Sequence, residues 1–203
     1  MLKRVIIFDF GGVLMKTVDR SPRYAWDARL NLPQGSVEHI VHSCESWHKA
    51  QTGLLTPAAY WADVAAQLHI SPAEVRQLEQ DFFSGDVLDA ALIDYIRQLR
   101  QAGHTVGLLS NDSVALVDKL RRLGIADLFD PLVISAQIGV MKPSPAAYQV
   151  LLAKLARPAQ AVIFVDDMPA NCTGAAALGI HAIRYTPDRD LAAELAPLLT
   201  VSE

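Results

Sequence analysis

An aspartate, Asp9, stands between an apolar run and a pair of glycines near the start of the chain. The run, Val5 to Phe8, is typical of a strand that is covered on both faces, as in a parallel sheet. The glycines, Gly11 and Gly12, allow backbone or a ligand to approach closely where that strand ends. Because open α/β sheets bind ligands at this end of their strands, Asp9 is a candidate reactive carboxylate. The alternative is an ordinary first strand whose aspartate caps the next turn.

Three later segments also place polar side chains directly after apolar runs. They are Ser110 and Asn111 after Leu109, Lys142 after Met141, near the end of the loop that follows the next strand, and the pair Asp166 and Asp167 after Val165. The carboxyl ends of parallel strands meet at one edge of a sheet, so we expect these groups to lie beside Asp9.

Such a set of side chains suits the transfer of a phosphoryl group to a carboxylate. Asp9 can attack a phosphate ester only if the repulsion between two anions is suppressed, and Mg²⁺ held by Asp166 and Asp167 would do so. Lys142 would neutralise one phosphate oxygen, and Ser110 would donate to another as charge develops. Covalent attack divides one hard hydrolysis into two easier steps. Ligands that are all oxygen favour Mg²⁺ over zinc as the cofactor.

Each of these residues also has an ordinary structural interpretation. Ser110 would cap the following helix, Lys142 would be a solvated loop cation, and the acidic pair would cap the helix that begins near Met168. Asn171 either supports Asp167 and metal-bound water or caps the same helix. The common order of the motifs along the chain favours the catalytic interpretation.

The elements that must position these groups alternate between strands and helices from about Leu88 onward. Besides the N-terminal strand, the expected strands are Val106 to Leu109, Leu132 to Ile134, Val162 to Val165 and His181 to Tyr185. The expected helices between them are Asp89 to Ala102, Val114 to Leu123 and Ala146 to Ala156. This alternation predicts an α/β fold with a doubly wound, Rossmann-like parallel sheet.

The segment between Lys16 and Gly85 shows helical periodicity and no convincing strand. Two helix starts have a hydroxyl before a proline, at Thr56 and Ser71, and Glu74 completes a capping box with Ser71. An earlier amphipathic helix that ends before Gly53 is indicated by apolar residues at helical spacing, namely Val37, Ile40, Val41, Cys44 and Trp47. The segment is therefore predicted to form a helical bundle.

These elements predict a core domain formed by residues 1–15 and 86–203 and a helical cap domain formed by residues 16–85. Linkers at 15–19 and 84–88 would act as hinges when the cap closes over the site and excludes water. Four residues before Gly53 are candidates to face the core, although two of them, His48 and Lys49, also suit a solvated helix. The four are Trp47, His48, Lys49 and Gln51.

Composition excludes several classes of partner. The 203 residues carry a net charge of −4 with no block of like charges, so neither nucleic acid nor a polybasic membrane anchor is indicated. The cysteines, Cys44 and Cys172, form no C-x-x-C pair, which argues against a disulfide framework or a structural zinc site. With no signal peptide or bilayer-spanning stretch visible, we expect a cytoplasmic protein, either monomer or dimer.

With these motifs in this order, the chain resembles the haloacid dehalogenase superfamily with a helical C1-type cap inserted after the first motif. In that family the first aspartate of a D-x-D-x-T/V motif attacks phosphorus, a serine or threonine and a lysine hold the transferring group, and a terminal acidic pair helps to bind Mg²⁺. The residues that match these roles are Asp9, Ser110, Lys142, Asp166 and Asp167. The resemblance also implies a small phosphate ester as substrate, with further phosphate contacts from Asn111, Gly11 and Gly12.

The chain departs from the family pattern at Gly11, where many phosphatases of the superfamily carry a second aspartate that protonates the leaving group. The carbonyl of Gly11 can still bind Mg²⁺, but the proton shuttle is missing unless Asp112 replaces it. A branch resembling α-glucose-1-phosphate phosphatases also has glycine here. Because an anomeric phosphate leaves a weakly basic hemiacetal oxygen, we expect a Mg²⁺-dependent phosphatase for a sugar phosphate, with a sugar 1-phosphate as the leading example.

Two other functions are alternatives. A haloacid dehalogenase uses its carboxylate on carbon without a metal, and the paired acids Asp166 and Asp167 argue against it because they would serve no purpose beside an anionic haloacid. A catalytically silent phosphate-binding or regulatory protein would explain Gly11, but it would not need Asp9 placed against an anion. Arg20 and Arg23 could bind a substrate anion, and a surface position is the simpler expectation for both.

Overall fold

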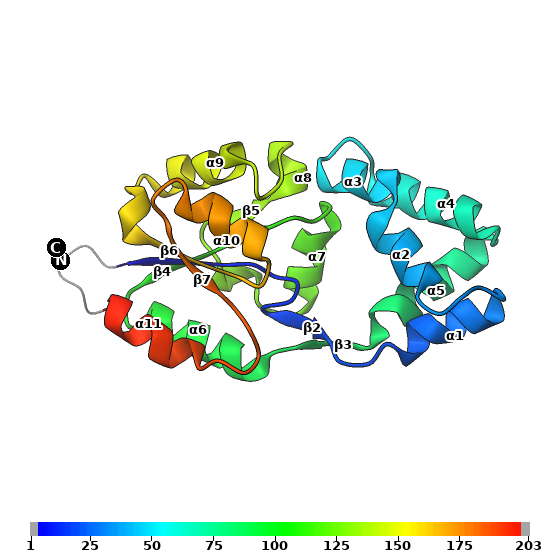
Figure 1. Cartoon of the computed structure of the whole chain (residues 1–203), viewed down its shortest axis with the longest axis horizontal. Helices are drawn as coiled ribbons and strands as arrows, with labels where there is room; N and C mark the ends of the chain where they lie inside the picture. The colour runs from blue at the N-terminus through cyan, green and yellow to red at the C-terminus, as the bar shows by residue number, and fades with distance from the viewer. Residues whose placement is uncertain (1–3, 200–203) are drawn as a thin grey trace.

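A five-stranded parallel sheet forms the centre of the computed structural model, which describes residues 4–199. Its strands lie in the order β5-β4-β1-β6-β7 (Figure 1). They are β1 (Val5–Phe8), β4 (Thr105–Ser110), β5 (Leu132–Ile134), β6 (Val162–Asp166) and β7 (His181–Arg184). This is the doubly wound arrangement predicted from the alternating elements, with the first strand in the middle of the sheet.

Helices cover both faces of the sheet. On one face lie α6 (Ala90–Gln101), α7 (Ala115–Arg122) and α11 (Leu191–Leu199), and on the other lie α8 (Ser135–Ile138), α9 (Pro145–Leu155) and α10 (Pro169–Ala176). Short 3₁₀ turns occupy Ala126–Leu128 and Ala159–Ala161. Alternate residues of β1 serve the two layers, because Ile6 and Phe8 join one core cluster whereas Val5 and Ile7 join the other.

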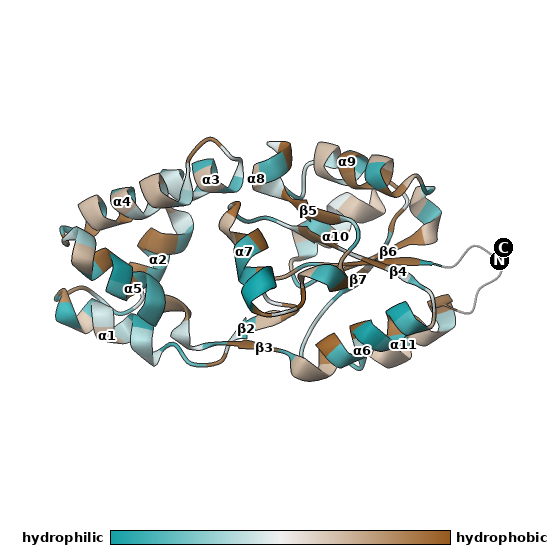
Figure 2. Cartoon of the chain, turned by 180° about the vertical axis from the view of Figure 1, so that it is seen from behind, coloured by the Kyte–Doolittle hydropathy of each residue, from teal (hydrophilic) through white to brown (hydrophobic). Residues whose placement is uncertain are grey.

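The hydropathy of the residues differs between the sheet and the helices that cover it. In Figure 2 the central strands are mostly brown, whereas the helices around them mix teal and brown residues, as amphipathic helices do. Among residues 4–199, none of the helices combines the length and the apolar character needed to cross a bilayer.

Five helices between β2 and β3 form a bundle at one end of the molecule (Figure 1). They are α1 (Ser21–Arg29), α2 (Ser36–Ser43), α3 (Glu45–Gln51), α4 (Pro57–Leu68) and α5 (Pro72–Ser84). The two predicted starts are confirmed, since Thr56 accepts from the N–H of Ala59 and Ser71 forms the capping box with Glu74. The bundle has its own core around Val64, Leu78 and other buried residues.

The single helix predicted through Val37 and Trp47 is wrong, because the chain forms two helices there. Cys44 separates them with an extended backbone, φ −73° and ψ 156°, which is the conformation of a residue that precedes a helix. The Sγ of Cys44 lies 3.0 Å from the hydroxyl of Ser46 in the first turn of α3. The apolar spacing therefore continued across a break that periodicity alone does not reveal.

The expectation of no strand between Lys16 and Gly85 is also wrong at its first residues. The strand β2 (Met15–Thr17) pairs antiparallel with β3 (Asp86–Leu88), so the two connections between core and bundle form one ribbon. Strands of three residues are too short to show a period, and their pairing depends on a partner that lies far away in the sequence. The predicted hinges coincide with this ribbon, and we propose that the domain division runs through it.

Arg23 is not the surface residue expected from the sequence. Only 2% of it is exposed, and its guanidinium donates to the carbonyl of Phe82 at 2.9 Å and to Glu38 at 2.8 Å. It also donates to Thr17 and Asp86, each at 3.0 Å. Arg23 therefore fastens the helical bundle to the ribbon. Arg20, in contrast, has a half-exposed side chain.

Candidate active site

The central position of β1 brings Asp9 to the edge of the sheet predicted for it. Phe8 pairs with Leu108 of β4 and with Val165 of β6, and the N–H of Asp9 donates to the carbonyl of Val165 at 2.9 Å. The next residues of these three strands, which include Asp9 and Asp166, are therefore side by side. Ser110 ends β4 one residue further on and is buried.

The ammonium of Lys142 is buried between two of these carboxylates. It lies 2.9 Å from Oδ1 of Asp9 and 2.7 Å from Oδ2 of Asp166, and it also donates to the carbonyl of Leu109 at 2.8 Å. The side chain of Lys142 has no exposed surface. A solvated loop cation is therefore excluded, and three hydrogen bonds satisfy all three donors of the ammonium.

Asn111 holds the backbone of Lys142 in place. Its side-chain amide donates to the carbonyl of Lys142 at 2.8 Å, and its side-chain oxygen accepts from the N–H of Lys142 at 2.8 Å. Both functions of the amide are thus engaged in positioning Lys142. A phosphate contact through this side chain would have to compete with those two bonds.

Asn171 supports Asp166 rather than Asp167, which corrects one of its two expected roles. Its amide lies 3.0 Å from each carboxylate oxygen of Asp166, and the N–H of Met168 donates to Oδ1 of the same group at 2.8 Å. The hydroxyl of Tyr148 in turn donates to the carbonyl of Asn171 at 2.7 Å. Tyr148 is a supporting residue that the sequence did not single out, because nothing near it in the chain marks its partner.

Three carboxylates gather at this edge. Oxygen atoms of Asp9, Asp166 and Asp167 lie within 4.8 Å of one another. Burial raises the pKa of Asp9 to about 6, Lys142 opposes that shift, and the charge of Asp166 adds to it. Burial and then the charge of Asp166 also raise the pKa of Asp167. A compact, all-oxygen, electronegative cluster of this kind fits a hard divalent cation such as Mg²⁺.

The two glycines after Asp9 differ in what surrounds them. Gly12 has a φ of +77°, and a Cβ atom there would lie 2.4 Å from a carboxylate oxygen of Asp167, so no other residue fits without displacing that group. At Gly11 a Cβ atom would meet nothing within 4 Å. Residue 11 therefore lacks the expected acid only because glycine has no side chain. The space beside it would accommodate the first atom of one.

A hollow of about 390 Å³ opens above Gly11 and Gly12, between the sheet and the helical bundle. Asp112 lines it, and burial raises the pKa of this carboxyl to about 6, with Lys119 opposing the shift and Asp9 adding to it. Lys119 of α7 lines the same hollow, 3.8 Å from Asp86. Sequence reasoning missed Lys119; the available signal was its place three residues after the apolar Leu116, which puts it beside the apolar face of the predicted helix.

The segment before Gly53 touches the core as predicted, but through one of its candidate residues in particular. The amide of Gln51 donates to the carbonyl of Asn111 at 3.0 Å. Gly53 has a φ of +75°, and a Cβ atom there would lie 2.2 Å from the carbonyl oxygen of Ala136, so the bundle approaches α8 closely. Lys49 pairs instead with Glu45 at 2.8 Å on the surface, and His48 is exposed.

Residues 3–179 match the model of a family described as haloacid dehalogenase-like hydrolases. A sesquiterpene phosphatase of Aspergillus oryzae is 25% identical over 97% of this chain and 96% of its own length. A phosphoglycolate phosphatase of Yersinia pseudotuberculosis is 31% identical over 66% of this chain, which spans 60% of that protein.

The fold also matches a solved structure closely. A HAD family enzyme of Bacteroides thetaiotaomicron, in complex with magnesium and inorganic phosphate, superposes with a TM-score of 0.80 at 20% identity, covering 95% of this chain and 98% of that one. At this identity the comparison shows a shared fold.

We expect Lys142→Met to lower the free energy of unfolding by about 3–5 kcal/mol, because it leaves two buried carboxylates facing each other without a counter-charge. The folded-state pKa of Asp9 would rise further above its unfolded value, so the penalty is absent below about pH 4 and grows as the pH rises to the folded pKa. Urea unfolding of the metal-free protein, followed across this pH range, measures both effects.

Lys154→Met is the matched control, since Lys154 is exposed on α9 and the change should cost less than about 0.5 kcal/mol. An equal loss in the two variants, or a loss independent of pH, would contradict the role given to the buried ammonium.

Proposed function

Because the chain belongs to the haloacid dehalogenase-like hydrolase family, we propose that it is a Mg²⁺-dependent phosphatase that hydrolyses a small phosphate ester through a phosphorylated Asp9. The observation that carries this proposal is the buried ammonium of Lys142 between Asp9 and Asp166, beside a third carboxylate. Relatives named as sesquiterpene and phosphoglycolate phosphatases support the reaction class.

In this proposal Asp9 is the nucleophile. Its Oδ1 accepts from the N–H of Phe10 at 2.7 Å and lies 2.9 Å from the ammonium of Lys142, so we assign the attack to Oδ2. A bond forms between that oxygen and phosphorus while the ester P–O bond breaks, and the departing oxygen takes its proton from solvent or, when it is strongly basic, from Asp112. Water then attacks the phosphorus of the phosphorylated Asp9 and releases inorganic phosphate, which restores the carboxylate.

The other groups at the edge would bind and orient. A pKa of about 6 leaves Asp9 ionised at neutral pH, as a nucleophile must be. Ser110 is placed to donate to a phosphate oxygen from the end of β4. Asp9, the carbonyl of Gly11, Asp166 and Asp167 would hold the cation. When bound there, Mg²⁺ supplies the positive charge that allows one anion to approach another.

The leaving group sets the finer substrate proposal. With Gly11 in place of an acid, the leaving group alone favours an ester whose oxygen departs with little need for protonation. A sugar 1-phosphate is the leading example among metabolites, and aryl phosphates share the property. Asp112 shares the hollow with Gly11 and is the carboxyl available to protonate slower leaving groups. We propose that it supports a residual activity on ordinary alkyl phosphates.

The two alternative functions fit the geometry less well. A metal-independent dehalogenase has no use for three clustered carboxylates next to an anionic substrate. A silent phosphate-binding protein would gain nothing from Asp9, which repels phosphate unless a cation or a reaction compensates.

Asp9→Asn should abolish release of phosphate from 4-nitrophenyl phosphate, with a loss of about 10³-fold or more, because the amide cannot attack phosphorus. Phosphate release is measured with Mg²⁺ and with a chelator, and the wild type should need the metal. Asp94→Asn is the control, since Asp94 is exposed on α6. If the wild type releases no more phosphate than Asp9→Asn, the protein is not this phosphatase.

Gly11→Asp should raise turnover of alkyl phosphates by up to about 10²-fold, because it restores an acid where a Cβ atom meets nothing within 4 Å. Gly11→Asn is the matched control, with the same size and no proton to give. Steady-state kinetics on butyl phosphate and 4-nitrophenyl phosphate separate the two effects. A gain shared by both variants, or no gain in either, would show that protonation of the leaving group does not limit the rate.

Asp112→Asn should reduce the residual turnover of alkyl phosphates by about 10-fold to 10²-fold and leave aryl phosphates nearly unchanged, since phenolates leave without a proton. The measured quantity is the ratio of kcat/KM for the two ester types. Equal losses on both would mean that Asp112 acts on structure or binding and donates no proton.

A further inference from the structure

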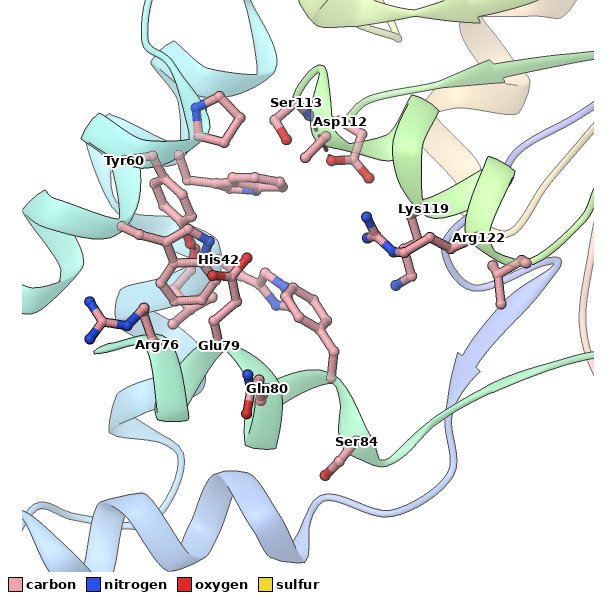
Figure 3. A pocket seen from close by; sticks show the side chains of 17 residues that line it. His42, Tyr60, Arg76, Glu79, Gln80, Ser84, Asp112, Ser113, Lys119 and Arg122 are labelled. Atoms are coloured by element: carbon pink, nitrogen blue, oxygen red, sulfur yellow. Dashed lines mark hydrogen bonds between the residues drawn. The ribbon is translucent and has the colours of Figure 1, made fainter. Parts of the chain in front are cut away.

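A second, larger cavity of about 780 Å³ adjoins the hollow above Gly11, also between the helical bundle and the core. The two share the residues at their boundary, namely His42, Phe83, Asp112 and Lys119. In Figure 3 the side chains of Asp112 and Lys119 approach this cavity from the core, and those of Tyr60 and His42 approach it from the bundle. The larger cavity is thus joined, through the hollow beside Gly11 and Gly12, to the segment that follows Asp9.

Aromatic rings form a continuous wall of the cavity. The ring of Tyr60 lies 5.2 Å from that of Trp47 and 5.1 Å from that of Trp61, and Trp61 meets Phe83 edge to face at 6.3 Å. Ring separations of this size are those of packed aromatic side chains. Val41 and Leu123 extend the apolar lining.

The polar atoms of these rings are turned to other partners. The hydroxyl of Tyr60 donates to the carbonyl of Val41 at 2.7 Å, so its single donor is already used. Trp61 hydrogen-bonds Glu79. Tyr60 and Trp61 therefore offer carbon to a ligand, and hydroxyl groups placed against these two rings would lose hydrogen bonds to water without replacing them.

Phe83 is the exposed part of this wall. Although it is a large aromatic residue, 38% of its surface is open, and it lines both cavities. Its ring is bordered by the ammonium of Lys119, 4.8 Å from the ring centre, at the side of the phosphate hollow. A cation thus lies beside the aromatic wall at the boundary, while the rest of the larger cavity carries polar side chains such as Arg76, Gln80 and Arg122. An anionic head joined to an apolar body could contact Lys119 and the rings together.

We propose that the preferred substrates are phosphate monoesters of large apolar alcohols, aryl or long-chain alkyl, with the apolar group seated against Trp47, Tyr60, Trp61 and Phe83. This inference rests on the proposed phosphatase activity and names the alcohol that the activity favours. A cavity of about 780 Å³ is within the range that holds ligands well above the size of a hexose. Aromatic contact area, rather than hydroxyl recognition, then sets the specificity.

A series of 4-alkylphenyl phosphates tests the proposal, because the phenol leaving group stays nearly constant while the apolar tail lengthens. We expect kcat/KM to rise by up to about fourfold for each added methylene from phenyl to 4-hexylphenyl phosphate. An n-alkyl phosphate series from ethyl to octyl should show the same slope at lower absolute rates, which tells the aryl and alkyl sources apart. Glucose 1-phosphate, whose leaving oxygen is also weakly basic, should fall below the 4-alkylphenyl phosphates because it has no apolar group to seat against the rings.

Phe83→Ala should flatten the slope with tail length, whereas Leu54→Ala, an exposed leucine of the bundle outside the cavity, should leave both slope and activity intact. If the Phe83 variant fails to fold, the dependence of the wild-type kcat/KM on tail length still tests the proposal. Hydrolysis with no dependence on tail length, or with glucose 1-phosphate preferred, overturns this inference and leaves the phosphatase standing. If no ester is hydrolysed in an Asp9-dependent way, both this inference and the proposed phosphatase function are overturned.

Discussion

The buried ion cluster of Lys142, Asp9 and Asp166 is the interaction on which the rest of the structure depends. Removing an ammonium and two carboxylates from water is costly, and it is tolerated here because each charge meets an opposite charge within 2.9 Å and further hydrogen bonds. The surrounding groups serve this cluster. Asn111 clamps the backbone of Lys142, while Asn171 fixes both oxygens of Asp166. The strand order of the sheet, with β1 between β4 and β6, brings these charges together.

The cluster has more negative than positive charges, and this excess indicates that it could bind a cation. One ammonium faces three carboxylates, so the edge of the sheet keeps a net negative charge even though an anionic ester is the proposed substrate. In the proposed function a divalent cation would resolve the conflict, because it would neutralise the acids and let a phosphate approach. Burial raises the pKa of Asp9 to about 6, and Lys142 opposes that rise, so the carboxylate is ionised at neutral pH.

The helical bundle is attached to the core and supplies aromatic residues to the cavity between them. Arg23 ties it to the ribbon of β2 and β3, and Gln51 touches the loop after β4, so the bundle is held at both ends of the hollow. Between these contacts its aromatic residues face the core across a cavity (Figure 3). Their positions in the sequence do not say whether these residues pack inward or line a cavity. In the structure Tyr60 is buried, whereas Phe83 leaves part of its ring exposed.

The sequence by itself determined the alternation of strands and helices in the core, the polar residues at the ends of β1, β4 and β6, and the loop that carries Lys142, because such features depend on neighbours a few residues apart. The starts at Thr56 and Ser71 belong to the same class. Only the tertiary structure decided which groups meet: that Lys142 lies on Asp166, 24 residues away, that Asn171 serves Asp166, and that Arg23 is buried. Such pairings depend on strand order and on the approach of the bundle to the core, which no local pattern encodes. For the same reason Gly11 revealed a missing acid in the sequence, whereas the room left beside it became known from the fold.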